Sequence, residues 1–285
     1  MKKFFILAVA AVMVTMNVNA QDDSKPYFEL NELPELLEIM PEPPAFDSPE
    51  FANDIVRYCW GKQQRMDPER VALAIADAEW DDLTKFFGQY AEAFGLAVTP
   101  EDTPEIYTLL VNSLATTDPM RKKCKAFYGR QRPFERFDDV MPSHEEDDLR
   151  GEGSYPSGHS LRGWGVALLL AQIAPERANE VFQRGWDYCN SRVIVGAHWQ
   201  SDVDASRTAA SIGFCALQGS PEFRAQMEKA QEEYAVKTGK TVGVETVAPA
   251  AQAPAQQYIF RVDGTRATEQ TRGIKVQDGR KYTTR

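Results

Sequence analysis

The chain has 285 residues, with 42 acidic and 32 basic side chains and a formal net charge of −10 at pH 7. An acidic chain repels the nucleic-acid backbone, which excludes nucleic-acid binding driven by the overall field of the protein. The length suffices for one sizeable hydrophobic core or two small ones.

The first twenty residues are predicted to be a secretory signal peptide rather than part of the fold. Lys2 and Lys3 precede an apolar stretch, 4–16, and residues 18–20, Val-Asn-Ala, supply a small-residue cleavage site. The apolar stretch is too short for a transmembrane helix, and no later run reaches membrane-spanning length. We therefore expect an exported, periplasmic protein without a membrane span, whose mature form starts at Gln21.

Residues 21–47 are acidic and rich in proline, and they are predicted to form an extended arm over the following domain. Its expected anchors are the apolar residues Leu30, Leu33, Leu36, Leu37 and Ile39.

Residues 48–235 are predicted to form a single compact all-α domain. Apolar residues recur there at helical spacing behind helix-start patterns at 47–49, 67–68 and 103–104, each of which contains proline. Another apolar face is formed by Phe86, Phe87, Tyr90 and Phe94. The alternation typical of strands is scarce, which favours an all-helical architecture.

The helical pattern breaks between Phe137 and Gly151. Six acids lie in this loop: Asp138, Asp139, Glu145, Glu146, Asp147 and Asp148. We interpret it as a solvated loop; calcium binding is the alternative, although the acids lack the spacing of an EF-hand. His144 lies in the same loop and is expected to be exposed.

Residues 236–285 are predicted to be a linker and a basic extension. Residues 246–257 are rich in Ala, Pro and Gln, and the last thirty residues carry seven Lys or Arg against three acids. Two strand-like segments, 258–262 and 274–277, each precede an Asp-Gly turn, which predicts a small β-hairpin.

Four cysteines, Cys59, Cys124, Cys189 and Cys215, form no CxxC pair, so the sequence has no zinc-site spacing. In an oxidising compartment they allow three disulfide pairings, among which the sequence does not choose. Buried reduced thiols in a helical core are an equally compatible alternative.

The segment 153–160, Gly-Ser-Tyr-Pro-Ser-Gly-His-Ser, opens a long apolar run and is predicted to start a helix. Pro156 and Ser157 are helix-start residues, and Gly158 lets a bound group approach the backbone. Unpaired N–H groups and the positive end of the helix dipole would then form an anion site beside His159. A capped helix whose histidine only packs is the alternative.

Two further segments supply what an anion site needs. Lys125 offers a point charge, and Arg132 a planar guanidinium that matches two phosphate oxygens. If a helix begins at His198, then Asp202 lies on the same face and holds one imidazole nitrogen, leaving the other as a nucleophile. In isolation, these patterns are equally typical of solvated helix ends and surface ion pairs.

In chain order the segments form a tripartite pattern, Lys125-x6-Arg132-Pro133, Pro156-Ser157-Gly158-His159 and Ser191-Arg192-x5-His198-x3-Asp202. The pattern resembles that of the type 2 phosphatidic-acid-phosphatase superfamily, which includes the vanadium haloperoxidases. Residues 43–49, 153–159 and 196–204 are most similar to the bacterial class A nonspecific acid phosphatases. The resemblance covers about residues 40–235 and not the basic tail; Ser160 stands where that family has threonine.

The resemblance implies an all-α fold of the acid phosphatase/vanadium haloperoxidase type. It also implies an exported, metal-independent acid phosphatase that acts on a broad range of phosphate monoesters without a cofactor, is inhibited by vanadate and can transfer phosphoryl groups. Expected partners are small phosphomonoesters, inorganic phosphate and further copies of the chain in a homo-oligomer. No nucleic-acid polymer is expected to bind.

By the same resemblance, His198 is the nucleophile that becomes a phosphohistidine, Asp202 orients it, and His159 is the general acid and then the general base. The phosphate oxygens would be held by Lys125, Arg132, Arg192, the Ser157 hydroxyl and the Gly158 N–H, which supply the charge stabilisation that phosphoryl transfer requires. The pH profile should be bell-shaped with a maximum below neutrality.

Three alternatives stay open at this point. The first is a vanadate-dependent haloperoxidase built on the same pocket, against which the chain length and the acid phosphatase motifs argue. The second is a membrane-embedded lipid phosphatase, which the absence of a predicted membrane span disfavours. The third is a non-catalytic protein that binds oxyanions.

Overall fold

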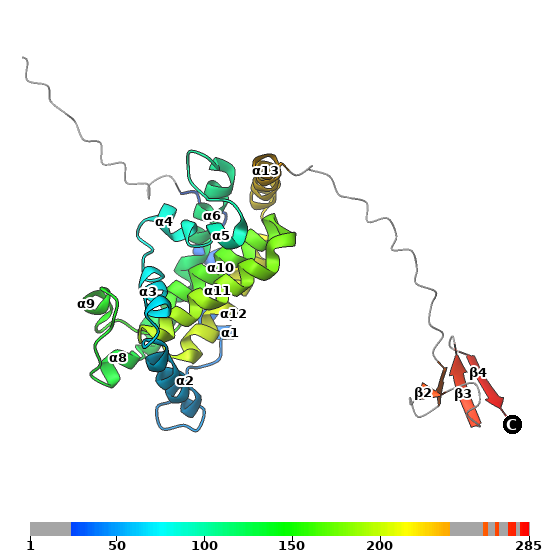
Figure 1. Ribbon diagram of the computed structural model, residues 1–285, viewed down its shortest axis with the longest axis horizontal. Helices are drawn as coiled ribbons and strands as arrows, with labels where there is room; N and C mark the ends of the chain where they lie inside the picture. Colours follow the sequence, from blue (N-terminus) through cyan, green and yellow to red (C-terminus); the bar gives the residue numbers. More distant parts are fainter. Residues whose placement is uncertain (1–23, 240–258, 262–265, 268–272, 278–279, 285) are drawn as a thin grey trace, which may run out of the picture. The chain divides into compact units, whose positions relative to one another are not determined.

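The computed structural model describes residues 24–239 and, in the C-terminal part, residues 259–261, 266–267, 273–277 and 280–284. The chain divides into two compact units, Met1–Thr241 and Val242–Arg285, which we treat separately. The first unit is helical where it is described (Figure 1), which confirms the predicted all-α fold. The predicted signal peptide lies outside the described residues.

The described part of the first unit is built from α-helices joined by short loops. They are α1 (Leu36–Ile39), α2 (Phe51–Gln64), α3 (Pro68–Ala76), α4 (Leu83–Gly88), α5 (Ala91–Phe94), α6 (Pro104–Thr117), α7 (Lys122–Tyr128), α8 (Pro133–Arg136), α9 (Glu146–Leu149), α10 (Gly158–Ile173), α11 (Ala178–Ile194), α12 (Gln200–Leu217) and α13 (Pro221–Thr238). Three short 3-10 helices accompany them: η1 (Leu30–Glu32), η2 (Asp118–Arg121) and η3 (Pro175–Arg177).

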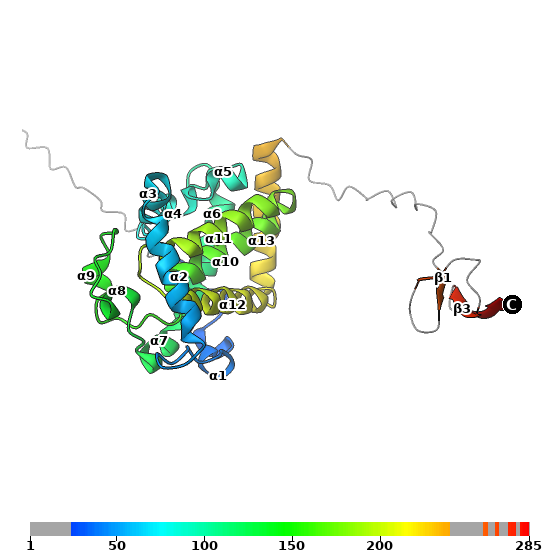
Figure 2. The same cartoon turned by 60° about the horizontal axis from the view of Figure 1, so that its bottom comes forward.

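Helix α10 is the centre of this unit and packs against both α11 and α12 (Figures 1 and 2). It is apolar on most of its circumference, which is typical of a buried helix. Gly163 allows the close contact with α11, because a Cβ built at this position would lie 2.2 Å from Cδ1 of Tyr188. Helices α10 and α11 therefore pack closely because residue 163 has no side chain.

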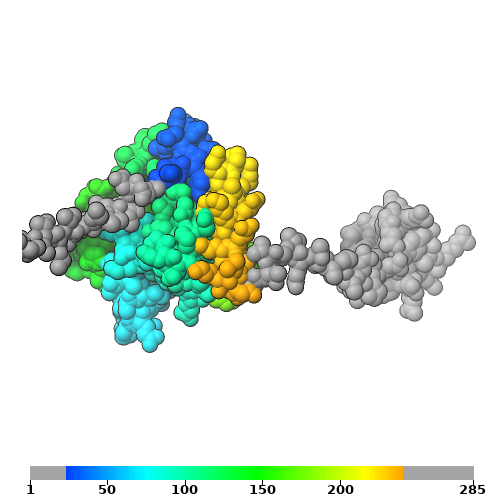
Figure 3. Space-filling view, turned by 90° about the horizontal axis from the view of Figure 1, so that it is seen from above, coloured from blue at the N-terminus to red at the C-terminus, as the bar shows by residue number. Residues whose placement is uncertain are grey.

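A large apolar core surrounds the central helices. Phe86, Phe87, Tyr90 and Phe94 are fully buried in it, as their spacing predicts. They do not share one helix, because Phe86 and Phe87 lie in α4, Phe94 lies in α5, and Tyr90 is the N-cap residue of α5. Helix α13 packs along α6 and closes the core on the face seen in Figure 3, where it is coloured yellow to orange. Phe223 and Met227 of α13 are buried in this contact region.

The predicted helix starts are present, with small shifts. Asp67 caps α3 by accepting hydrogen bonds from the N–H groups of Glu69 and Arg70, at 3.0 and 3.2 Å. Helix α6 begins at Pro104 as expected, whereas α2 begins at Phe51, two residues beyond the proline of its start pattern.

The arm before α2 is not extended throughout, since it contains η1 and α1. Glu35 caps α1 by accepting a hydrogen bond from the N–H of Leu37 at 3.5 Å. Leu33 and Leu36 are buried together, whereas Leu30 and Ile39 are exposed. A single helical turn brings residues three apart onto one face, which a purely extended arm would not do.

The prediction of a solvated acidic loop is wrong for part of the loop. Asp139 accepts hydrogen bonds from the side chains of Tyr58 and Lys62, and Glu145 is buried. Glu146, Asp147 and Asp148 lie in α9, where Asp147 and Asp148 are exposed, and Asp138 is exposed just after α8. His144 is exposed as expected, 3.4 Å from Glu79.

The second unit contains a four-stranded antiparallel sheet in the order β2-β1-β3-β4. Its strands are β1 (Ile259–Arg261), β2 (Arg266–Ala267), β3 (Gly273–Gln277) and β4 (Arg280–Thr284). The predicted strand 258–262 contains β1, and the predicted strand 274–277 covers β3 except its first residue, Gly273. The two strands pair with Phe260 opposite Val276. Each gains a further partner strand, so the hairpin is part of a larger sheet; the predicted Asp-Gly turns lie outside the described residues.

All four cysteines are free thiols, with Cys124 and Cys189 buried and Cys59 and Cys215 exposed. The structure therefore favours the reduced alternative over the disulfide pairings. Within residues 24–239 and the described strands, no helix has the length and apolar character needed to cross a membrane.

Candidate active site

His198 lies in the tight connection between α11 and α12. The chain turns at Gly196, whose φ of 81° is in the left-handed region that favours glycine, and the N–H groups of Ala197 and His198 both donate to the carbonyl of Arg192. Helix α12 begins only at Gln200, so His198 precedes the helix rather than starting it. Its side chain is nonetheless buried.

Asp202 approaches His198 as the four-residue spacing predicts. Its Oδ2 lies 3.6 Å from Nδ1 of His198 and accepts a hydrogen bond of 2.8 Å from the Trp199 N–H. That bond caps α12 at Trp199, the residue before the first residue of the helix. Arg130 donates a hydrogen bond of 2.6 Å to the other oxygen of Asp202, so the carboxylate is held rigidly beside the imidazole.

Arg130 is a supporting residue that the sequence reasoning did not assign. Its guanidinium also donates to Asp54 at 2.8 Å and to the Ser201 hydroxyl at 2.7 Å. Asp54 belongs to α2, far away in the sequence, so the spacing of the three motifs gives no sign of this contact. Through Arg130, helix α2 helps to position Asp202.

Lys125 and Arg132 lie on the other side of His198. Nη1 of Arg132 is 3.1 Å from Nε2 of His198 and donates to the Ala197 carbonyl at 2.9 Å. Nζ of Lys125 donates to the Gly153 carbonyl at 2.6 Å, and Nη2 of Arg132 donates to the same carbonyl at 3.3 Å. Both cations are thus held against the loop that leads into α10.

The start of α10 is tied to α12 through Ser157. The Ser157 hydroxyl caps α10 by accepting a hydrogen bond of 3.3 Å from the Ser160 N–H. The Ser157 N–H donates to the Asp202 carbonyl at 3.3 Å, and the Ser206 hydroxyl donates to the Ser157 carbonyl at 2.8 Å. These bonds hold the positive end of the α10 dipole next to the His198 segment.

His159 and Arg192 meet at Glu145, which the sequence reasoning interpreted as part of a solvated loop. Nη2 of Arg192 donates to both Glu145 oxygens at 2.8 and 2.9 Å, and Nε2 of His159 lies 3.3 Å from Oε1 of Glu145. The same His159 nitrogen is 3.0 Å from the Ala78 carbonyl. The acidic composition was the only sequence signal for Glu145, and it does not separate this residue from its exposed neighbours.

Two donors of Arg192, Nε and Nη1, are buried without a hydrogen-bond partner among the residues that the structure describes. Buried polar groups in proteins are normally paired, so unpaired guanidinium donors indicate a place for an acceptor that the chain itself does not supply. A phosphate oxygen has the required charge and lone pairs.

Comparisons with known proteins identify the family of the chain. Residues 106–221 match the PAP2 superfamily. The chain is 37% identical over 248 residues to a non-specific acid phosphatase of Providencia stuartii, an alignment that covers 82% of this chain and 98% of the relative. The chain belongs to the PAP2 superfamily, in the branch of the bacterial class A nonspecific acid phosphatases.

Two other relatives are similar to this chain over most of their length. The non-specific acid phosphatase of Salmonella typhimurium is 38% identical over 197 residues, covering 68% of this chain and 78% of the relative. An acid phosphatase of Zymomonas mobilis is 36% identical over 192 residues, covering 67% of this chain and 72% of the relative.

The electrostatics of this acid phosphatase site are dominated by its clustered cations. Burial lowers the pKa of His198 well below 6.5, and the charges of Arg132, Lys125 and Arg192 lower it further. Burial and the charges of Arg192 and Arg162 do the same to the pKa of His159. Both imidazoles are therefore biased toward the neutral form until a negative charge enters.

The pKa values of two of the neighbouring cations, Lys125 and Arg132, are also lowered. Burial lowers the pKa of Lys125 well below 10.5, with Arg132 and Arg121 as further causes. Burial, together with Arg192, lowers the pKa of Arg132 to about 10, although Asp202 opposes the shift. An oxyanion bound among these groups would relieve their mutual repulsion.

Proposed function

We propose that this chain is an exported acid phosphatase that hydrolyses small phosphate monoesters through a phosphohistidine on His198. The observation that carries the proposal is the placement of His198, which has a carboxylate near Nδ1 and a guanidinium 3.1 Å from Nε2. An imidazole so placed can present Nε2 to a phosphorus atom whose oxygens are bound by the neighbouring cations.

The reaction would proceed in two displacements. Nε2 of His198 attacks phosphorus, the ester P–O bond breaks, and His159 donates a proton to the leaving oxygen. Water then attacks the phosphohistidine, His159 takes a proton from the water, and the P–N bond breaks to release inorganic phosphate. Asp202 stabilises the positive charge that develops on His198 during attack.

Charge stabilisation would come from Lys125, Arg132 and Arg192 and from the N-terminus of α10. Phosphoryl transfer spreads negative charge over three equatorial oxygens, and preorganised donors lower its barrier most. Loss of one such donor typically costs about a hundredfold in rate. These groups can supply that stabilisation from the chain itself, so we expect activity to survive a metal chelator.

Two further properties belong to the same proposal. An alcohol that replaces water in the second step would receive the phosphoryl group, which gives phosphotransferase activity. Export is proposed from residues 1–20, whose sequence has the charge pattern and cleavage site of a signal peptide.

The test is hydrolysis of a chromogenic phosphomonoester between about pH 4 and pH 9 in the presence of EDTA. We expect wild-type protein to be active with a maximum below neutrality, to be inhibited by vanadate and to form an acid-labile phosphoenzyme. His198→Ala should abolish all of these, whereas His144→Ala, at an exposed histidine, serves as the matched control.

Three outcomes would contradict the proposal. Equal activity of wild type and His198→Ala would show that the nucleophile is wrongly assigned. Loss of activity in EDTA would contradict the metal-independent mechanism. Inactivity of wild type, with halide oxidation after addition of vanadate and peroxide, would favour the haloperoxidase alternative.

A further inference from the structure

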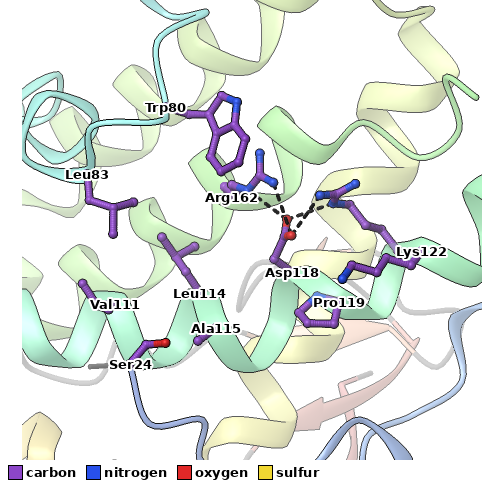
Figure 4. A pocket seen from close by; sticks show the side chains of 11 residues that line it. Ser24, Trp80, Leu83, Val111, Leu114, Ala115, Asp118, Pro119, Lys122 and Arg162 are labelled. Atoms are coloured by element: carbon purple, nitrogen blue, oxygen red, sulfur yellow. Dashed lines mark hydrogen bonds and ion pairs between the residues drawn. The ribbon is translucent and has the colours of Figure 1, made fainter. Parts of the chain in front are cut away.

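A cavity lies beside His159 of the candidate active site; we call it the Trp80 cavity. Its volume is about 370 Å³, within the range of small-molecule sites. It is lined by Ser24, Trp80, Leu83, Val111, Leu114, Ala115, Asp118, Pro119, Arg121, Lys122 and Arg162 (Figure 4). One part of the lining is apolar, from α4 and α6, and the other part is charged, from η2, α7 and α10.

The charged part carries more positive than negative charge. Asp118 accepts two hydrogen bonds from Arg121, at 2.8 and 2.9 Å, and is also paired with Arg162, whose Nε lies 2.9 Å from it. The single carboxylate of Asp118 thus neutralises only one of the two guanidinium charges. Lys122 adds a third cation and makes no ion pair with any residue in the described part of the chain.

This surplus of charge is only partly exposed to water. The side chains of Arg121 and Arg162 are 16% and 8% exposed. The guanidinium of Arg162 lies 3.8 Å from the centre of the Trp80 ring, which supplies some cation–π stabilisation but no negative charge. A partly buried excess cation is costly unless an anion joins it.

The Trp80 cavity adjoins the catalytic groups on the side of His159. The rings of Trp80 and His159 are in edge contact, with centroids 6.3 Å apart. A Cβ built at Gly158 would lie 3.0 Å from Nε of Arg121. In the two-step reaction, His159 protonates the leaving oxygen, so the leaving group must lie on this side of the phosphorus atom.

We propose that the Trp80 cavity is the leaving-group subsite and that it selects phosphomonoesters whose leaving group carries a second anionic group on an apolar or aromatic body. The apolar lining accepts the body, and Arg121, Lys122 and Arg162 accept the second anion. This inference rests on the proposed phosphatase function and adds a substrate class to it.

A matched pair of substrates tests the inference: 4-carboxyphenyl phosphate, which carries the second anion, and its neutral methyl ester. The ester group withdraws electrons more strongly and makes the better leaving group, so intrinsic reactivity favours the neutral substrate. We expect wild-type kcat/KM to be about fivefold higher for the carboxylate, a ratio that falls as salt is added.

Lys122→Gln should bring this ratio toward one, because it removes one of the cations that would bind the carboxylate. The variant should fold normally, since Lys122 is exposed and has no ion-pair partner in the described part of the chain. Arg162→Gln should lower it as well, with circular dichroism to check that the variant is folded. Lys229→Gln, at an exposed lysine on α13, is the matched control and should keep the wild-type ratio.

The subsite proposal would be overturned if the wild-type ratio were one or below. It would also be overturned if both cavity variants kept the raised ratio of the wild type. These results differ from failure of the phosphatase proposal, in which neither substrate is hydrolysed. Replacing the carboxylate by a second phosphate on the same ring would show whether the cavity distinguishes the two anions; preference for neither over the neutral ester would also overturn the proposal.

Discussion

Glu145 is the residue that links the candidate phosphate-binding group Arg192 to the candidate acid His159. It is buried and accepts two hydrogen bonds from Nη2 of Arg192. Nε and Nη1 of Arg192 have no hydrogen-bond partner among the residues that the structure describes. Its negative charge also lies 3.3 Å from Nε2 of His159, where it favours the protonated imidazole. We infer that Glu145 is a positioning residue for both.

Glu145→Gln tests this role because glutamine keeps the shape and removes the charge. We expect kcat/KM to fall by about tenfold or more, since Arg192 loses its anionic partner. The alkaline limb of the pH profile should move to lower pH, because His159 then loses its proton more easily. Asp148→Asn, at an exposed acid of the same loop, is the control; a fall in activity without any movement of the limb would indicate a purely structural role.

The pKa shifts of the two histidines give a second prediction at this scale. The pKa of His159 and that of His198 both lie well below 6.5 in the free protein. The mechanism needs His159 protonated and His198 neutral, so kcat/KM should rise as pH falls from neutrality and drop again when His198 is protonated.

Bound phosphate adds negative charge and raises the pKa of His159, so the alkaline limb of kcat should lie at higher pH than that of kcat/KM. The measurement is steady-state kinetics over the full pH range. A rate that still increases near pH 9 would contradict the assignment of His159 as the acid.

Site residues can be predicted from the sequence when they lie in short local motifs, and not when their role depends on partners distant in the sequence. His159, His198 and Asp202 lie in short motifs whose local spacing sets their geometry, and the structure brings them near the predicted cations. Arg130 and Glu145 act through partners distant in the sequence, Asp54 on α2 and Arg192 on α11. Composition alone describes such residues as ordinary surface charges.

At the scale of elements, the site depends on how α10, α11 and α12 pack. Gly163 of α10 has the Tyr188 ring of α11 against it, whereas a Cβ added at Gly165 on the same helix would meet no neighbouring atom of the described residues within 4 Å. Both glycines therefore lie within the same helix, but only Gly163 is packed against a neighbouring side chain.

Gly163→Ala should destabilise the protein by about 1–3 kcal/mol, because the added methyl group overlaps the Tyr188 ring and the helices must separate. Gly165→Ala should be neutral or stabilising by up to about 1 kcal/mol, since alanine is the better helix former. Urea unfolding monitored by circular dichroism measures both. Equal destabilisation by the two substitutions would show that the α10–α11 contact is less close than described.

Sequence periodicity predicts most of these helices because proline and capping residues mark their starts locally. It fails at the arm, where the α1 turn is stabilised by burial of Leu36 rather than by a strong local pattern. It also fails at the start of α12, which lies at Gln200 because the Asp202 side chain caps the Trp199 N–H. Tertiary contacts override propensity in both places.

At the scale of the whole molecule, a net charge of −10 coexists with a strongly cationic pocket. The pocket is formed by residues between Lys125 and Asp202, all of which belong to the unit Met1–Thr241. The β-sheet unit, Val242–Arg285, contributes none of the candidate site residues. We therefore infer that the phosphate chemistry belongs to the helical unit.

A chain that ends at Thr241 tests this division. Because every candidate catalytic and phosphate-binding residue is retained, kcat/KM for a small phosphomonoester should stay within about twofold of the full-length value. The thermal unfolding of the helical unit should also be unchanged. Truncation before α13 is the matched control, because that helix buries Phe223 and Met227 against the core, and its loss should unfold the unit. A Thr241 truncation that folds with native circular dichroism but loses hydrolysis would place part of the active site in the C-terminal unit and refute the division.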